Sequence, residues 1–465
     1  MADLKVDFCG IESPNPFWLA SAPPTNTGAQ VERAFAAGWG GAVWKTLGNP
    51  IVNVSSRFGG LDYGSQRMMG LNNIELITDR PLEVNLREMA QVKRRYPKHV
   101  LVASLMVDTK AEWQEIIKKV EDVGCDALEL NFGCPHGMCE RGMGSAVGAE
   151  PKVLRELTSW VMECANVPVI VKLTPNVGDI TEPASAAMEA GTSAISLINT
   201  VKSIMGVDLD RMVPLPRVGD ASSNGGYCGP AVKPIALHLL GQVARLPNVV
   251  PISGIGGIAT WRDAAEFMAL GSTTVQVCTA VMHYGYRIVE DMIEGLSDFL
   301  DDRGMSSAME LVGRAVPNYR NWGDLDMNHH VVAEIDPERC IGCQLCFVSC
   351  MDGSHQCIHL PGMSEEEKRR RGHVVFPAEV PDRAALGEGA IAGARVPWVH
   401  AEECVGCNLC QLVCPVEGCI SMRERRKGEA RLSWNERIAS GDDLVPGGLD
   451  ATRAARAGRS EGGGE

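Results

Sequence analysis

Short apolar runs alternate with amphipathic stretches through the first three hundred residues of the chain. The runs are rich in β-branched side chains and are bounded by turn-forming residues, which is typical of buried strands. The pattern predicts eight strands, at Phe17–Ser21, Ala42–Thr46, Val100–Met106, Ala127–Asn131, Val169–Leu173, Ala194–Ile198, Val249–Ser253 and Thr274–Cys278.

Most of these runs are followed by a segment whose apolar residues recur at helical spacing. The predicted helices are Gln30–Ala37, Ala111–Val123, Pro151–Cys164, Ile180–Glu189, Ile235–Leu246, Trp261–Leu270 and Tyr286–Leu300. Alternation of strand and helix predicts an α/β fold with a parallel sheet. Eight such units in about 300 residues predict a TIM barrel. A doubly wound open sheet is the alternative.

The pattern changes after the last predicted helix. We expect a barrel over residues 1–302, a connector over 303–330 and a small α+β, ferredoxin-like domain over 331–437. Within that domain, residues 360–397 carry a charged run with several Gly and Pro, which is typical of an exposed insertion. Residues 438–465 have few large apolar side chains, so we expect a disordered tail.

Charge and hydropathy exclude several classes of protein. With 44 basic and 58 acidic residues the net charge is −14, which argues against nucleic-acid binding. The first ten residues lack the apolar core of a signal peptide, and no run of eighteen apolar residues could cross a membrane. These features predict a cytoplasmic protein.

The chain has 17 cysteines, and in a reducing compartment such a number indicates metal ligation rather than disulfides. Eight of them form two runs with the spacing C-x₂-C-x₂-C-x₃-C. They are Cys340, Cys343, Cys346 and Cys350 in the first run, and Cys404, Cys407, Cys410 and Cys414 in the second. This spacing predicts two [4Fe–4S] clusters, and zinc, which usually takes two C-x₂-C pairs, is the alternative.

In two-cluster ferredoxins the fourth cysteine of a run ligates the other cluster. We therefore predict that Cys414 joins Cys340, Cys343 and Cys346, whereas Cys350 joins the second run. Met351 stands where the second run has Pro415. Cys357 and Cys419 lie close by and are predicted to be core thiols, with a role as spare ligands as the alternative. Because clusters carry electrons singly, a flavin is needed to join them to two-electron chemistry.

Polar residues follow the predicted barrel strands, at the rim where TIM barrels place their active sites. An isolated Asn after a strand is usually a turn residue, but several polar groups on one rim favour a site. These residues are Ser21, Lys45, Thr46, Asn131, Lys172, Asn199, Thr200, Cys278 and Thr279.

The segment from Gly254 to Ala259 contains three glycines and loosely fits the dinucleotide fingerprint G-x-G-x-x-A. It follows the seventh strand and not the first, so we interpret it as the barrel's phosphate cradle for a mononucleotide such as FMN. Gly225 and Gly226 could add N–H donors, or could form only a flexible turn.

The segment Asn131-Phe-Gly-Cys134-Pro135 places a thiol three residues beyond a strand end, in a loop that continues with several glycines to Gly144. A thiol on such a loop can approach a ligand and give up a proton, which is general-acid chemistry. A structural thiol or a metal ligand is the alternative.

These motifs resemble the dihydroorotate dehydrogenase superfamily, and the extension His-Gly-Met-Cys-Glu-Arg-Gly-Met-Gly after Cys134-Pro135 resembles dihydropyrimidine dehydrogenases. The similarity covers roughly residues 1–435 and is closest to bacterial forms whose pyrimidine-binding and flavin–NAD halves are separate chains. Further matching motifs are Asn73-Ile-Glu75-Leu-Ile, Lys172-Leu-Thr-Pro-Asn176, Asn199-Thr-Val and Gln276-Val-Cys-Thr279.

The resemblance implies reduction of uracil or thymine by hydride from FMN N5 to C6 of the base, with Cys134 as the general acid at C5. It implies a partner subunit that carries FAD and the NAD(P)H site, and therefore a hetero-oligomer. The implied substrate-binding residues are Asn73, Asn131, Phe132, Gly133, Asn199 and Thr200. The implied FMN-binding residues are Ser21, Lys45, Thr46, Lys172, Gly226, Gly256, Gly257, Cys278 and Thr279.

Gly133 departs from the family, because the animal enzymes have Ser there. Two other functions stay open: dihydroorotate oxidation, and electron transfer without catalysis. His136, where dihydroorotate dehydrogenases have Asn, counts against the first, and the intact polar rim counts against the second.

Overall fold

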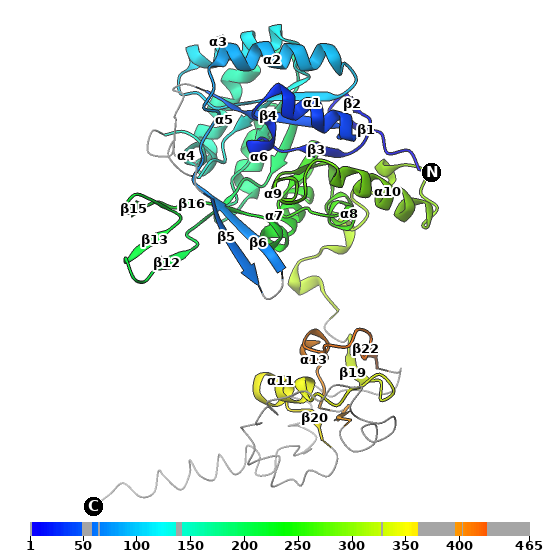
Figure 1. Ribbon diagram of the computed structural model, residues 1–465. Coiled ribbons are helices and arrows are strands. Elements are labelled where there is room, and N and C mark those ends of the chain that lie inside the picture. The colour runs from blue at the N-terminus through cyan, green and yellow to red at the C-terminus, as the bar shows by residue number, and fades with distance from the viewer. Residues whose placement is uncertain are drawn as a thin grey trace, which may run out of the picture. The chain divides into compact units, whose positions relative to one another are not determined.

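The structure is a computed structural model that describes residues 2–48, 58–63, 66–135, 142–326, 329–360, 396–401 and 403–425. The chain divides into two compact units, residues 1–320 and 321–465 (Figure 1). No helix among the described residues is long and apolar enough to cross a membrane.

The first unit contains a closed barrel of eight parallel strands, which confirms the predicted TIM barrel. Each strand pairs with the next along the chain, and the last pairs with the first, Val275 lying opposite Phe17. The strands are β3 (Phe17–Leu19), β4 (Gly41–Leu47), β7 (Val100–Leu105), β8 (Ala127–Asn131), β9 (Val169–Lys172), β10 (Ala194–Leu197), β17 (Ile252–Ile255) and β18 (Ser272–Val277).

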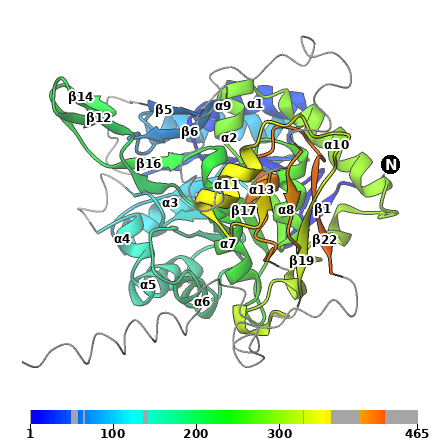
Figure 2. The same ribbon diagram turned by 90° about the horizontal axis from the view of Figure 1, so that it is seen from below.

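Helices surround the strands as an outer layer (Figures 1 and 2). Local sequence determines where several helices begin and end. Thr109 and Thr260 form capping boxes with Glu112 and Asp263 at two helix starts, and Gly38 ends the first helix in a left-handed conformation. The helices are α1 (Gly28–Ala37), α2 (Leu82–Arg95), α3 (Lys110–Asp122), α4 (Ser145–Gly148), α5 (Pro151–Met162), α6 (Thr181–Glu189), α7 (Lys233–Ala244), α8 (Trp261–Ala269), α9 (Thr279–Tyr284) and α10 (Ile288–Asp301).

The predicted strand Val249–Ser253 is wrong at both ends. Strand β17 begins after Pro251, which has no N–H for the ladder, and it continues through Gly254 to Ile255. A side chain on Gly254 would lie 2.4 Å from Ser272 Oγ, so this glycine allows close packing inside the barrel. The glycine loop therefore begins at Gly256 and not at Gly254. Helix α2 was not predicted from the sequence.

Short strands between the barrel elements cover the two ends of the barrel. At one end, β1 (Val6–Phe8) pairs with β2 (Ile11–Ser13), and Phe8 packs against Trp18 and the first residues of several barrel strands. At the other end, segments after β4 and β10 form a four-stranded sheet, ordered β11-β16-β6-β5. Its strands are β5 (Phe58–Tyr63), β6 (Gln66–Asn73), β11 (Val201–Ser203) and β16 (Gly225–Cys228).

The same excursion after β10 also forms two small hairpins. They pair β12 (Gly206–Asp208) with β13 (Val213–Leu215), and β14 (Arg217–Val218) with β15 (Ala221–Ser222). Part of the predicted connector belongs to the barrel unit, because Ala308 and Leu311 are buried in its core and Asp3 pairs with Ser307.

The second unit repeats one local pattern twice: a strand, a cysteine run, a helix and a strand. The first copy comprises β19 (Val331–Ile335), α11 (Leu345–Gly353) and β20 (Ile358–His359), and the second β21 (Trp398–Val399), α13 (Leu409–Leu412) and β22 (Ile420–Glu424). The copies interlock, since β19 pairs with β22 and β20 with β21. Most of the predicted insertion, 361–395, and the whole predicted tail lie outside the described residues.

Candidate functional site

A cavity of about 420 Å³ opens at the C-terminal ends of the barrel strands. It is lined by all but three of the residues predicted to bind substrate or cofactor, so the rim residues identified in the sequence do meet in one place. The predicted residues that line it are Ser21, Lys45, Thr46, Asn73, Asn131, Cys134, Lys172, Asn199, Thr200, Gly256, Gly257, Cys278 and Thr279.

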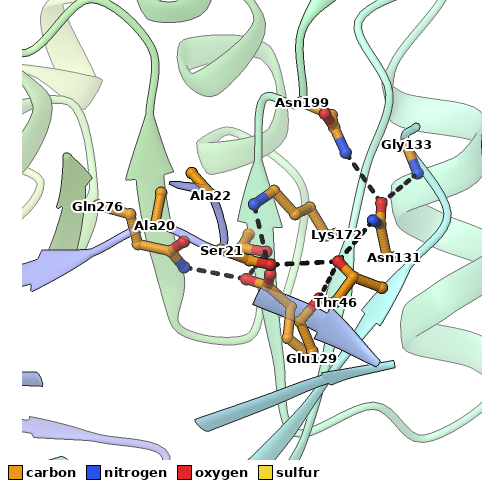
Figure 3. Close-up of polar contacts among 12 residues, drawn as sticks. Ala20, Ser21, Ala22, Thr46, Glu129, Asn131, Gly133, Lys172, Asn199 and Gln276 are labelled. Atoms are coloured by element: carbon orange, nitrogen blue, oxygen red, sulfur yellow. Dashed lines mark hydrogen bonds and ion pairs between the residues drawn. The ribbon is translucent and has the colours of Figure 1, made fainter. Parts of the chain in front are cut away.

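A chain of hydrogen bonds fixes the amide groups on one side of this cavity (Figure 3). Asn131 Nδ2 donates to Thr46 Oγ1 at 3.0 Å, and Asn131 Oδ1 accepts from Asn199 Nδ2 at 3.0 Å. Thr46 Oγ1 lies 3.1 Å from Ser21 Oγ and 2.9 Å from Ser104 Oγ. These contacts join β4, β7 and β8 to the loops after β3 and β10, so each amide presents a defined donor or acceptor.

Two ion pairs, one partly and one fully buried, hold the lysines that line the cavity. Lys45 Nζ lies 2.7 Å from Glu75 Oε1, and Glu75 itself lines the cavity from the loop after β6. Lys172 Nζ lies 3.3 Å from Oε1 of Glu129, whose carboxylate is fully buried inside the barrel. Each cation therefore already has a carboxylate partner.

Cys134 lines the cavity three residues after β8, as predicted. The residue is 5 % exposed and packs with Ile77, Met106 and Met143. Its carbonyl accepts from Ser145 N at 2.9 Å, and Gly144 approaches so closely that a side chain there would lie 2.7 Å from that oxygen. The loop on both sides of the thiol is thus anchored. Residues 136–141 of this loop, His136 included, lie outside the described residues.

Backbone conformation supports the predicted cradle at the β17 end. Gly256 and Gly257 have φ values of 129° and 77°, and side chains there would lie 2.8 Å from Ala236 Cβ and Lys233 N, respectively. Thr279, at the first position of α9, lines the same part of the site, and its hydroxyl donates to Cys228 Sγ at 3.2 Å. Burial raises the pKa of Cys228 to about 11 and also raises that of Cys278, so both are neutral thiols.

Three predicted residues do not line the cavity. The Phe132 ring is buried and packs edge-on against Trp113. A side chain on Gly133 would meet Asn199 Cβ at 2.4 Å, and one on Gly226 would meet Thr200 Oγ1 at 2.1 Å. The two glycines therefore act by letting neighbouring residues approach, and the Gly226 carbonyl accepts from Asn73 Nδ2 at 3.3 Å.

Four residues that line or support the cavity had no role predicted from the sequence: Glu75, Glu129, Gln276 and Cys228. The sequence does contain a feature that points to Glu129 and Gln276, because each is a polar residue within an apolar strand. Gln276 is buried, and its Oε1 has no hydrogen-bond partner among the described residues.

In the second unit the cysteines surround two small hollows, each lined by members of both runs. Cys340, Cys343 and Cys346 line one of them together with Cys414. Cys404, Cys407 and Cys410 line the other together with Cys350. This grouping has the same crossed arrangement as the predicted ligand sets.

A fifth cysteine lines each hollow. Cys357 Sγ lies 3.6 Å from Cys350 Sγ in one, and Cys419, which is also buried, lines the other. Within the described ranges, no three His, Cys, Asp or Glu side chains converge closely enough to hold a single metal ion.

Comparison with known proteins identifies the barrel. Residues 3–300 match the family model described as dihydroorotate dehydrogenase. The chain belongs to the dihydroorotate dehydrogenase family. Within it, the chain is 44 % identical over 374 residues to NAD-dependent dihydropyrimidine dehydrogenase subunit PreA of Escherichia coli (strain K12), which covers 80 % of this chain and 90 % of that protein.

Two other relatives match a shorter part of the chain. Dihydropyrimidine dehydrogenase (NADP(+)), chloroplastic, of Arabidopsis thaliana is 42 % identical over 337 residues, 70 % of this chain and 79 % of that protein. The catalytic subunit of dihydroorotate dehydrogenase B (NAD(+)) of Pyrococcus abyssi (strain GE5 / Orsay) is 36 % identical over 321 residues, 67 % of this chain and 99 % of that protein. The chain is thus an oxidoreductase subunit most similar, among these three, to the dihydropyrimidine dehydrogenase subunit.

Proposed function

We propose that this chain reduces uracil or thymine to the 5,6-dihydropyrimidine, reversibly, in the barrel cavity. Cys134, the proposed general acid, lines the same cavity as Asn73, Asn131, Asn199 and Thr200, and this is the observation that carries the proposal. The similarity to the PreA subunit of E. coli supports the same substrate class.

The cavity has features that suit FMN. Gly256 and Gly257 line the cavity with positive φ and no side chain, so their backbone can approach a phosphate closely, and Gln276 Oε1 is a buried acceptor that still needs a donor. Gly256, Gly257 and Thr279 would hold the phosphate, and Ser21, Lys45, Thr46 and Lys172 would contact the ring. When bound, FMN supplies the hydride chemistry that links two-electron reduction of the base to one-electron carriers.

The chain's own residues bind the base and move a proton. Asn73, Asn131, Asn199 and Thr200 hold the amide edges of the base, because an amide side chain both donates and accepts. The fixed network around Asn131 and Thr46 makes these groups ready before substrate arrives. The Cys134 thiol gives its proton to C5 of the base.

Two [4Fe–4S] clusters in the cysteine-rich unit would carry electrons between this site and a partner subunit. The crossed grouping of the cysteines around two hollows supports this part of the proposal. The partner would hold FAD and the NAD(P)H site, and the name of the E. coli relative, a subunit, is consistent with such a complex. A reducing cytoplasm suits so many thiols.

Dihydroorotate is the competing substrate, since the P. abyssi relative shares the barrel. Its carboxylate needs a cation, yet the two lysines that line the cavity among the described residues are both paired with carboxylates. This pairing favours a neutral base.

Turnover of the purified, FMN-loaded chain separates these functions. With dithionite as the electron source we expect reduction of uracil, and with an electron acceptor no oxidation of dihydroorotate. With NADH we expect uracil reduction only after the partner subunit is added. Dihydroorotate turnover above uracil turnover, or NADH-driven reduction by the chain alone at the rate of the complex, would contradict the proposal.

A further inference from the structure

Glu129 is the most deeply buried charged group that the proposed mechanism does not use. It is the middle residue of β8, and its residue exposure is 0 %. A carboxylate removed from water in this way needs several donors to offset its desolvation. Its donors come from three different strands of the barrel.

The two carboxylate oxygens have separate partners (Figure 3). Oε1 accepts from Lys172 Nζ on β9 at 3.3 Å. Oε2 accepts from Ser196 Oγ on β10 at 2.9 Å and from Gln276 Nε2 on β18 at 3.0 Å. Lys172 and Gln276 both line the cavity, whereas Glu129 and Ser196 do not. Glu129 therefore holds Lys172 and Gln276 in place without lining the cavity itself.

The same contacts determine how Gln276 is turned. Its Nε2 donates both to Glu129 and to Ser253 Oγ, the latter at 3.2 Å. Its Oε1 is consequently left as an acceptor, buried and without a partner in the described part of the chain. The cavity thus has a cationic donor, Lys172 Nζ, and a carbonyl acceptor, both held by one carboxylate.

We propose that Glu129 is a positioning residue for the flavin: it holds the Lys172 ammonium as a donor and turns Gln276 so that its carbonyl accepts. This inference rests on the proposed function, since it needs FMN in the cavity. The Lys172 ammonium as donor and the Gln276 carbonyl as acceptor together complement an imide edge, in which a carbonyl lies beside an N–H. The flavin ring and the pyrimidine base both have such an edge.

The position of Gln276 favours the flavin over the base. Gln276 lies on β18, three residues before Thr279, and its strand pairs with β17, which leads into the Gly256–Gly257 loop. The amides proposed to hold the base come from other elements, β6, β8 and the loop after β10. Glu129 also offsets the charge of Lys172, so it limits how strongly that cation favours negative charge on the reduced ring.

The test is the midpoint potential of FMN bound to Glu129→Gln, measured by anaerobic titration, with the KM for uracil measured in parallel. Loss of the carboxylate leaves Lys172 without its counter-charge, so we expect the potential to rise by about 30 mV, a tenfold change for a two-electron couple. Ser196→Ala is the control, because it removes one donor but keeps the carboxylate, and its potential should match that of the wild type.

An unchanged or lower potential in folded, FMN-bound Glu129→Gln would overturn the inference. So would a raised KM for uracil with an unchanged potential, because the pair would then serve the base. A wild-type chain that binds no flavin would instead overturn the proposed function, and this inference with it.

If Glu129→Gln does not fold, thermal unfolding of the flavin-free chain decides the question. The double variant Glu129→Gln/Lys172→Met removes both buried charges, so it should show a cooperative thermal unfolding transition that Glu129→Gln lacks. If the double variant gains nothing over the single one, Glu129 does not hold Lys172 and the inference fails.

Discussion

The barrel and the cysteine-rich unit hold their proposed cofactors in different ways. The barrel has an extensive apolar core of its own, in which Trp39, Trp44 and Trp113 are among the buried residues, and its site lies at the strand ends above that core. In the described part of the cysteine-rich unit, six of the eleven buried residues of the core are cysteines, and all six line the two hollows.

This difference concerns what each unit needs in order to fold. Because the barrel buries a large apolar core, we expect it to be stable without a ligand. Among the described residues of the second unit, few large apolar side chains besides Phe347 are buried, so its core and its proposed cluster ligands are largely the same residues. Small domains with so little core depend on metal for their stability.

Removing the clusters should therefore unfold one unit and spare the other. We expect anaerobic chelation after oxidation to abolish amide-exchange protection in β19 and β22, while β7 and β8 keep theirs. Hydrogen exchange followed by mass spectrometry measures both in one sample. Protection that persists in β19 and β22 would mean that the apolar residues suffice and that the comparison is wrong.

Single cysteine substitutions sharpen the comparison within the second unit. We expect Cys414→Ala to remove the cluster bound by Cys340, Cys343 and Cys346, and Cys350→Ala to remove the other. Paramagnetic resonance of the reduced chain distinguishes the two losses. Cys419→Ala is the matched control and should retain both signals. If each substitution removes the cluster of its own run, the crossed assignment fails.

In the barrel, substitution of one site residue should change chemistry but not structure. Cys134→Ala is expected to slow uracil reduction by roughly 10²–10⁴-fold, the contribution typical of a general acid. FMN absorbance and both cluster signals should stay unchanged, since the barrel core does not depend on this thiol.

Cys164→Ala supplies the control for that substitution. This thiol lies just beyond α5, donates to two carbonyls of that helix at 3.4 and 3.5 Å and does not line the cavity, so turnover should match that of the wild type. Near-normal turnover in Cys134→Ala itself would show that Cys134 is not the general acid.

The smallest expected effect tests whether the barrel unfolds independently of the cysteine-rich unit. Thr109→Ala removes the capping box of α3 and should lower the free energy of unfolding of the barrel by about 1 kcal/mol. Ser159→Ala, on the exposed surface of α5, should change it by less than about 0.5 kcal/mol. Urea unfolding followed by tryptophan fluorescence measures both. A parallel loss of cluster absorbance at the same urea concentration would show that the units do not unfold separately.

Sequence alone predicted the features that follow from a repeated local pattern. Apolar runs marked the strands, and because parallel strands end at one rim, polar residues such as Lys45 and Asn131 could be assigned to one site. Cysteine spacing predicted how the two runs would be grouped. The family resemblance placed Phe132 in the site, but its ring packs in the core against Trp113. Local pattern could not correct this, because it does not determine which way a side chain faces beyond a strand.

The pairs inside the barrel could not be predicted in the same way. Glu129 and Lys172 are more than forty positions apart, and Lys45 meets Glu75 only because the β5–β6 excursion returns to the rim. Such contacts depend on the closed geometry of eight strands, which no single segment specifies. The glycines Gly133 and Gly226 likewise depend on which residue lies opposite them.

Closure of the barrel also sets the order of events during synthesis. Phe17 of β3 pairs with Val275 of β18, more than 250 positions later, so the ribosome must translate nearly the whole barrel before its first strand gains its last neighbour. Until then the nascent chain has two unpaired strand edges, which are sites of chain–chain association. Chains stalled on the ribosome before Val277 should therefore be digested by protease, and chains stalled well after it should resist.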